Sequence, residues 1–193
     1  MKKWDGKDDN QALKIIDFGQ ANQYSSANAT STKFCGTPRY LAPEVLLLTP
    51  YNPYSADVWS LGVLILKART GRLPFGAAGD LTAYMTEYSQ FLRDMEQPGK
   101  TPVGVICNMT KWKPDLFSAG LTQLLNKMLQ PNPEKRPTMS EVLTDPWVVQ
   151  AATSQVGKLP QRRPTFASRV RDAVVGCFVK PVLGVQALLR ARG

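Results

Sequence analysis

Two tripeptides constrain the fold of this chain more than any other feature of its sequence: Asp17-Phe18-Gly19 and Ala42-Pro43-Glu44. A short apolar run at residues 13–16 precedes the first tripeptide and predicts a β-strand that ends in a tight turn at the glycine. Between the tripeptides, residues 20–34 are rich in Ser, Thr, Asn and Ala without an apolar period, which predicts a surface loop. A short helix is expected to follow Pro43.

Helices dominate the prediction for the next part of the chain. Ser55 is expected to be the N-cap of a long helix that ends at Gly71 and Pro74. Asp80 is expected to cap a second helix with one apolar face. That face consists of Leu81, Tyr84, Met85, Tyr88, Phe91 and Met95.

The remainder of the body combines an irregular segment with two more helices. Pro and Gly punctuate residues 97–117, which are expected to be irregular. A helix is predicted over residues 118–129, and Thr138 with Glu141 carries the signature of a capping box for another. The body is therefore predicted to be mainly α-helical, with one strand and no internal repeat.

Charge divides the chain at about residue 150. The net charge is +9; residues 1–150 hold 16 Lys and Arg against 14 Asp and Glu, and residues 151–193 hold 8 against 1. A nearly neutral body argues against a nucleic-acid surface, so the basic tail is predicted to be a separate element. The three cysteines form no Cys-x-x-Cys pair, which is typical of reduced thiols in the cytoplasm, with the nucleus as the alternative.

The two tripeptides belong to four motif blocks that together resemble the protein kinase family, in its order and at its spacing. The blocks are Leu13-Lys14-Ile15-Ile16-Asp17-Phe18-Gly19, Gly36-Thr37-Pro38-Arg39-Tyr40-Leu41-Ala42-Pro43-Glu44, Tyr54-Ser55-Ala56-Asp57-Val58-Trp59-Ser60-Leu61-Gly62 with Gly71-Arg72-Leu73-Pro74-Phe75, and Met128-Leu129-Gln130-Pro131-Asn132-Pro133-Glu134-Lys135-Arg136-Pro137-Thr138 with Asp145-Pro146-Trp147. The second block resembles serine/threonine kinases, and within them the calmodulin-dependent and checkpoint-like branches.

The resemblance implies the helical C-terminal lobe of the α+β kinase fold, without its β-rich N-terminal lobe. Residues 1–150 would be a truncated kinase domain that runs from the activation segment to the last helix, followed by the basic tail. The family's glycine-rich loop, strand lysine and catalytic loop precede the position of Asp17, and residues 1–16 contain none of them. We therefore expect that the parent kinase transfers phosphate from ATP to protein Ser or Thr. We expect this chain to be inactive by itself.

By the same resemblance, Asp17, Phe18 and Gly19 would contact ATP and Mg²⁺. Asp17 would hold the metal ion between the β- and γ-phosphates, Phe18 would pack inward and set the direction of the aspartate, and Gly19 would allow the tight turn. The aspartate that accepts the substrate proton belongs to the catalytic loop, so no catalytic residue is assigned. We expect neither cofactor to bind this chain alone.

Docking and structural roles follow from the resemblance for further residues. Thr37, Pro38 and Tyr40 would shape the loop on which a protein substrate docks. Glu44 and Arg136 would form a buried ion pair that locks this loop to the helical lobe.

Three positions bear on regulation and stability. Asp57 would accept hydrogen bonds from the catalytic loop and is expected to lack these donors here, which is costly if its carboxylate is buried. Lys33 stands where many relatives carry a phosphorylatable threonine, and the adjacent Thr32 is a candidate phosphorylation site.

The tail, residues 151–193, is predicted to be a linker followed by an amphipathic helix. Residues 162–166 resemble a substrate site of basophilic kinases, with Thr165 as the acceptor. Apolar and basic residues alternate beyond it, so residues 160–193 are expected to bind calmodulin or an anionic membrane surface. A membrane span is disfavoured, because Lys180 near its centre would cost roughly 2.5–3.5 kcal/mol.

Two explanations of such a chain stay open at this point, and a third rests on the tail. The chain is either an incomplete sequence of a complete kinase or a short binding protein. The latter would be a decoy or scaffold whose docking loop and helix 80–95 bind a protein substrate or a kinase-binding protein. Retained Asp57 and Phe18 favour the first explanation, because their family partners lie upstream. The third reading is a module that binds calmodulin or membrane through its tail.

Overall fold

The computed structural model describes residues 16–26, 28–76 and 81–155. These residues divide between two compact units, one of which is residues 19–149. Of the described residues, the other unit contains 16–18 and those from 150 onward. The predicted strand, apart from Ile16, lies outside the described part, as do Asp80 and residues 156–193 with Thr165. Residues 151–155 were predicted to begin a linker, and this was wrong, because they are the last residues of the helix Pro146–Gln155.

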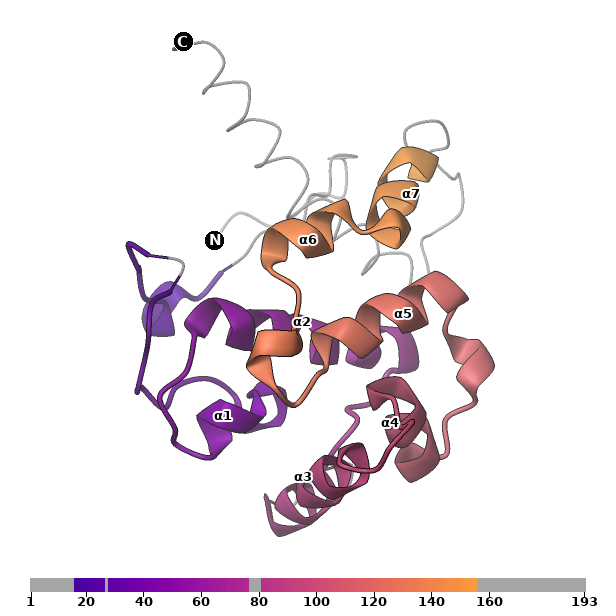
Figure 1. The fold of residues 1–193 in the computed structure, drawn as a ribbon, viewed down its shortest axis with the longest axis horizontal. Helices are drawn as coiled ribbons and strands as arrows, with labels where there is room; N and C mark the ends of the chain where they lie inside the picture. The colour runs from indigo at the N-terminus through magenta and orange to yellow at the C-terminus, as the bar shows by residue number, and fades with distance from the viewer. Residues whose placement is uncertain (1–15, 27, 77–80, 156–193) are drawn as a thin grey trace, which may run out of the picture. The chain divides into compact units, whose positions relative to one another are not determined.

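Helices make up nearly all the regular structure of the described residues, which form no β-strand beyond one isolated bridge (Figure 1). This agrees with the predicted helical lobe. The α-helices are α1 (Pro43–Leu46), α2 (Pro53–Thr70), α3 (Leu81–Met95), α4 (Pro102–Thr110), α5 (Ala119–Met128), α6 (Met139–Thr144) and α7 (Pro146–Gln155). The 3₁₀ turns are η1 (Phe18–Gln20), η2 (Pro38–Tyr40), η3 (Pro114–Leu116) and η4 (Pro133–Lys135). In this described part, no helix is both long and apolar enough to cross a bilayer.

The N-cap of α2 is Asn52 rather than Ser55, so the predicted N-cap was wrong. The side chain of Asn52 accepts hydrogen bonds from the backbone N–H groups of Tyr54 and Ser55, at 2.9 and 3.2 Å, and Pro53 occupies the first helical position. Ser55 instead donates its hydroxyl to the carbonyl of Pro133 at 2.9 Å. Gly71 ends the helix as predicted, with a left-handed φ of 76° that glycine adopts at little cost.

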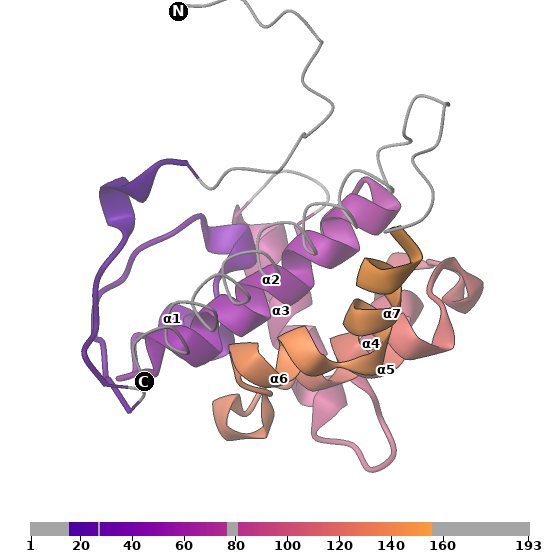
Figure 2. The same cartoon turned by 90° about the horizontal axis from the view of Figure 1, so that it is seen from above.

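Helix α2 is the longest of the described helices and lies at the centre of their packing, with α1 beside its N-terminal part (Figure 1, Figure 2). Helix α5 packs directly on α2, and the two approach closely at Gly62. A Cβ atom at this position would lie 2.8 Å from Cδ2 of Leu129. The glycine therefore permits the close contact between α2 and the end of α5.

Residues 97–117 were predicted to be irregular, and this was wrong. They contain α4, whose N-cap is Thr101 with its hydroxyl accepting the N–H of Gly104, and whose first residue is Pro102. The helix packs on both α3 and α5, and the N–H of Val103 donates to the side chain of Asn126 at 2.9 Å. Its buried residues are Pro102, Val103, Val105, Ile106 and Cys107.

An aromatic cluster joins α3 to α2. Trp59, Phe75, Tyr88 and Phe91 are buried, and their ring centroids lie 5.1–6.5 Å apart. The predicted apolar face of α3 is confirmed at its centre, but Met85 points outward and is 39% exposed. Edge-to-face aromatic pairs stabilise a core by more than the burial of their apolar area alone would.

Two tyrosines of α3 differ in how their hydroxyls are satisfied. The hydroxyl of Tyr84 donates to the carbonyl of Pro38 at 2.7 Å, whereas the buried hydroxyl of Tyr88 has no hydrogen-bond partner in the described structure. Burial raises the pKa of Tyr88 well above its ordinary value, so the phenol stays neutral. An unsatisfied buried hydroxyl costs free energy that phenylalanine would not.

We expect Tyr88→Phe to raise the free energy of unfolding by about 1 kcal/mol, because it removes a buried polar group that has no partner. Tyr84→Phe is the matched control on the same helix, and it should lower that free energy by about 1 kcal/mol because a hydrogen bond is lost. Urea denaturation measures both. A Tyr88→Phe variant less stable than the parent would contradict the prediction.

Candidate substrate-docking site

The predicted docking loop is anchored at both ends of η2 by side chains from two helices. Tyr84 of α3 donates its hydroxyl to the carbonyl of Pro38 at 2.7 Å, and Ser60 of α2 donates to the carbonyl of Tyr40 at 2.9 Å. Thr37 precedes η2 and is exposed, with no side-chain cap bond. The structure thus brings the predicted docking residues together on one turn and leaves the Thr37 hydroxyl open to solvent.

A buried ion pair fixes the segment that follows the docking loop. Nη1 and Nη2 of Arg136 lie 2.6 and 2.8 Å from the two carboxylate oxygens of Glu44 on α1. Arg136 also donates to the carbonyls of Ser55, Gln130 and Pro131, and its guanidinium lies 5.0 Å from the ring centroid of Trp59. The geometry matches the predicted pair, and its bidentate form is the strong form of this interaction.

Asp57 lies on α2, and its carboxylate makes no hydrogen bond with the described residues. The residue as a whole is exposed, yet the surrounding protein desolvates its carboxylate and raises its pKa. Because the pKa of Asp57 is higher in the folded chain than in the unfolded chain, its ionised form lowers the free energy of unfolding at neutral pH. This loss becomes smaller as the pH falls through the folded pKa and the carboxylate takes up a proton. A donor brought to this position would remove the cost.

The predicted metal-binding turn is present only in part. Asp17 adopts a left-handed φ of 62°, a strained conformation for a residue with a side chain, and it is exposed. Phe18 is 68% exposed, so the expectation that it packs inward was wrong, because no described element covers its ring. Among the described residues, no three acidic, Cys or His side chains gather as a metal site. Mg²⁺ sites in proteins usually combine one or two carboxylates with water molecules and substrate phosphates, so Asp17 would supply one of several oxygen ligands.

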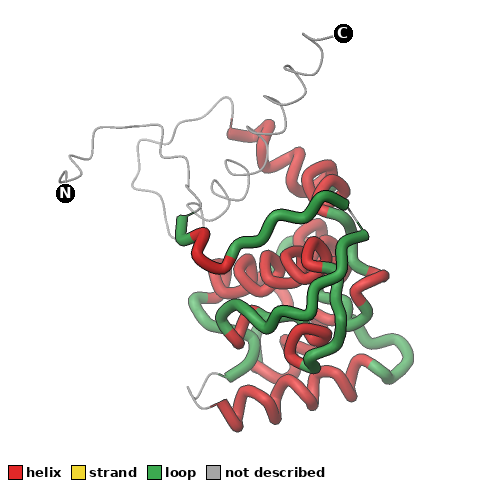
Figure 3. The backbone as a smooth tube through the Cα atoms, turned by 90° about the vertical axis from the view of Figure 1, so that its left-hand side faces the viewer, coloured by secondary structure: helices red, strands yellow, loops and turns green. Residues whose placement is uncertain are grey.

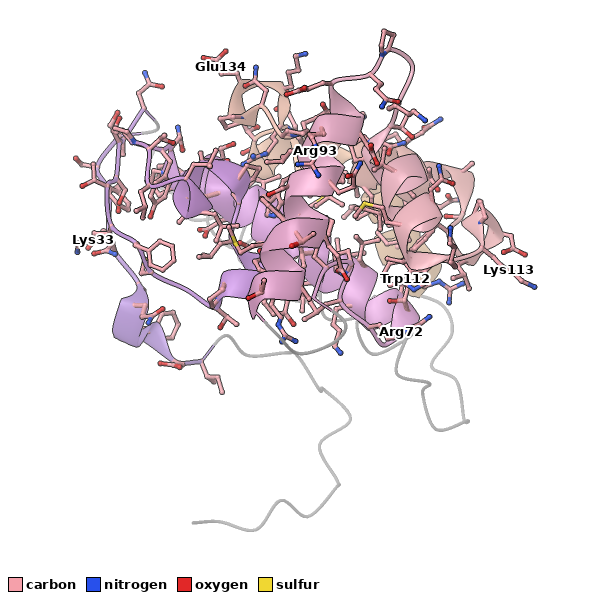
Figure 4. All side chains as sticks on the ribbon, turned by 90° about the horizontal axis from the view of Figure 1, so that it is seen from below. Lys33, Arg72, Arg93, Trp112, Lys113 and Glu134 are labelled. Carbon is pink, nitrogen blue, oxygen red and sulfur yellow. The ribbon has the colours of Figure 1, made fainter. Side chains whose placement is uncertain are left out.

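The loop before the docking turn runs outside the helices as an extended segment (Figure 3). Thr32 is exposed on it, and Lys33 lies on its outer side (Figure 4). The Nζ of Lys33 donates to the side chain of Asn22 at 2.7 Å. The position at which the family resemblance implies a phosphorylatable threonine is therefore occupied by a lysine whose Nζ is already bound within the loop.

Sequence reasoning missed Ser60 and Tyr84, the two side chains that support the docking loop. Neither is marked by charge or by a motif of its own: Ser60 lies inside the third block, and Tyr84 looks like an ordinary core residue of an amphipathic helix. The only signal in the sequence was the hydroxyl on an otherwise apolar face, since buried tyrosines usually find a hydrogen-bond partner.

Comparison with known proteins agrees with the four motif blocks. The protein kinase domain family matches residues 6–148. A probable serine/threonine-protein kinase, MARK-A of Dictyostelium discoideum, is 34% identical over 149 residues, which cover 77% of this chain and 12% of that protein. CBL-interacting serine/threonine-protein kinase 12 of Arabidopsis thaliana is 34% identical over 142 residues, covering 72% and 25%. Sperm motility kinase 3A of Mus musculus is 35% identical over 152 residues, covering 79% and 25%.

The matched region is thus most of this chain but a quarter or less of each of these relatives. The family match begins ahead of the predicted metal-binding turn and ends at the start of α7, so it includes the predicted docking loop and the Glu44–Arg136 pair.

Proposed function

Because this chain belongs to the protein kinase family, we propose that it is the substrate-docking lobe of a serine/threonine kinase, and that the whole protein transfers phosphate from ATP to protein Ser or Thr. The observation that supports this most directly is the docking loop. It is held by Ser60 and Tyr84 at η2 and by the Glu44–Arg136 pair just beyond it. Assignment to the calmodulin-dependent or checkpoint-like branch stays a prediction from the motif residues.

The whole protein supplies the test of this proposal. The product of the full-length message, traced from its 5′ end, should phosphorylate Ser or Thr in protein substrates when ATP and Mg²⁺ are present. Asp17→Asn should abolish the reaction, because a neutral amide holds Mg²⁺ poorly. A folded full-length product that phosphorylates neither residue type would refute the proposal.

The 193 residues by themselves are expected to transfer no phosphate. They contain no segment that matches the glycine-rich loop, the strand lysine or the catalytic loop, and phosphoryl transfer depends on all three to position and neutralise the phosphates. The purified chain, incubated with ATP, Mg²⁺ and Ser/Thr peptides, should incorporate no more phosphate than its Asp17→Ala variant. Incorporation above that control would contradict the expectation.

A non-catalytic binding module is the second candidate function. The specific observation in its favour is that Ser60, Tyr84 and the Glu44–Arg136 pair all lie inside residues 19–149, so these anchors of the docking loop come from one compact unit. Such a module would bind a protein substrate or a kinase-binding protein without modifying it. The basic residues 160–193 would add calmodulin or an anionic membrane as a partner, a proposal that rests on their sequence alone.

A further inference from the structure

The loop before the docking turn is paired with the segment between α1 and α2. The N–H of Ser31 donates to the carbonyl of Tyr51 at 2.8 Å, and the N–H of Tyr51 donates to the carbonyl of Ser31 at 2.9 Å. The two residues form an antiparallel bridge, and both are buried although they lie in loops. One bridge of two hydrogen bonds is too weak to order a loop, so other contacts must hold it.

Two tyrosine hydroxyls supply those contacts. Tyr51 donates its hydroxyl to the carbonyl of Lys33 at 2.7 Å, and Tyr54 donates to the carbonyl of Tyr24 at 3.0 Å. The rings of Tyr24 and Tyr54 meet edge to face with centroids 6.3 Å apart. Tyr54 belongs to the first turn of α2, which Asn52 caps, so a rigid helix end sets its position. We call Tyr51 and Tyr54 with these contacts the tyrosine clasp.

Lys33 adds two further hydrogen bonds within the same loop. Its Nζ donates to the side chain of Asn22 at 2.7 Å, and its N–H donates to the hydroxyl of Ser31 at 3.2 Å. A phosphate here would be an acceptor and would require a cluster of basic donors. The lysine is itself the donor, and its acceptor lies in the same loop.

We propose that the tyrosine clasp and Lys33 fix residues 22–26 and 28–33 without phosphorylation, so that the docking turn is positioned in the unmodified protein. The docking loop begins only a few residues after Lys33, so the position of Lys33 determines where the docking turn starts. This inference rests on the proposed function and deepens it by naming how the docking site is kept in place. Its test measures conformation alone and is therefore independent of any phosphoryl transfer.

Trypsin provides a direct probe, because it cleaves after lysine and the Lys33–Phe34 bond lies beside the clasp. Lys100 lies in an exposed turn outside the clasp and serves as the internal reference. In unphosphorylated protein produced in bacteria, cleavage after Lys33 should be slower than cleavage after Lys100. The double variant Tyr51→Phe, Tyr54→Phe should accelerate cleavage after Lys33 by roughly tenfold or more, because two hydrogen bonds are lost. Cleavage after Lys100 should not change.

Tyr88→Phe is the matched control, since it removes a tyrosine hydroxyl that makes no hydrogen bond in the described part of the chain. It should leave the cleavage rate after Lys33 unchanged. Hydrogen exchange gives a second measurement: the amides of Ser31 and Tyr51 should be protected in the parent and exposed in the double variant. Equal cleavage of the parent at Lys33 and Lys100, or a double variant as resistant as the parent, would overturn the inference.

Discussion

Replacing Arg136 by methionine is expected to lower the free energy of unfolding by about 3–5 kcal/mol. The change leaves the Glu44 carboxylate, which is 9% exposed, without the two donors that compensate its loss of water. It also leaves three backbone carbonyls without the donors that Arg136 gives them. An unpaired buried charge costs more than the pair itself contributes, so the loss should be large.

Urea denaturation of Glu44→Gln, Arg136→Met and the double variant measures the coupling between the two residues. The decrease in the free energy of unfolding of the double variant should be much smaller than the sum of the two single decreases. Once one partner has been replaced, the ion pair is already absent, so replacing the other partner removes no further pairing. Lys127→Met is the matched control. Lys127 pairs with Asp145 at 3.4 Å but is 59% exposed, so its loss should change stability by less than about 1 kcal/mol. Small and additive effects at Glu44 and Arg136 would show that they do not interact.

Phe91→Ala is expected to lower the free energy of unfolding by about 3–5 kcal/mol, through lost burial and the cavity left behind. Phe91 has no exposed surface, and its ring lies 5.2 Å from Phe75 and 6.0 Å from Trp59 between centroids. Thermal or urea denaturation gives the measurement.

Met85→Ala is the control for Phe91→Ala, because it lies on the same helix but is 39% exposed. It should cost clearly less than Phe91→Ala, because more than a third of Met85 is already exposed to solvent and its truncation removes less buried apolar area. Equal losses for Phe91→Ala and Met85→Ala would contradict the burial that separates the two faces of α3.

The sequence predicts those parts of the fold that depend on local or motif signals. Glu44 and Arg136 could be paired from the sequence alone because both belong to motif blocks. The capping box of Thr138 and Glu141 could be predicted because it is complete within one turn, and the structure confirms it. Helix α4 was missed although Thr101 and Pro102 carry a start signal, because the surrounding Pro and Gly residues outweighed it.

The contacts that hold the docking turn could not be predicted in the same way. Tyr51 and Tyr54 meet residues 24–33 across the chain, and no periodicity or spacing in the sequence marks such loop-to-loop bonds. The N-cap at Asn52 was missed because Ser55 is an equally good cap by residue type, and only the observed bonds decide between them. Roles at the metal-binding turn depend on groups that lie outside residues 16–155, so they stay predictions.

The separation between Glu44 and Arg136 has a kinetic consequence. They lie 92 residues apart, so joining them closes a loop that includes α2, α3, α4 and α5. Closing so long a loop costs chain entropy, and packing among the enclosed helices shortens it first. The pair is therefore expected to form after the folding transition state. Losing it would speed unfolding more than it slows folding, so the lifetime of the folded lobe would depend on the contact that is made last.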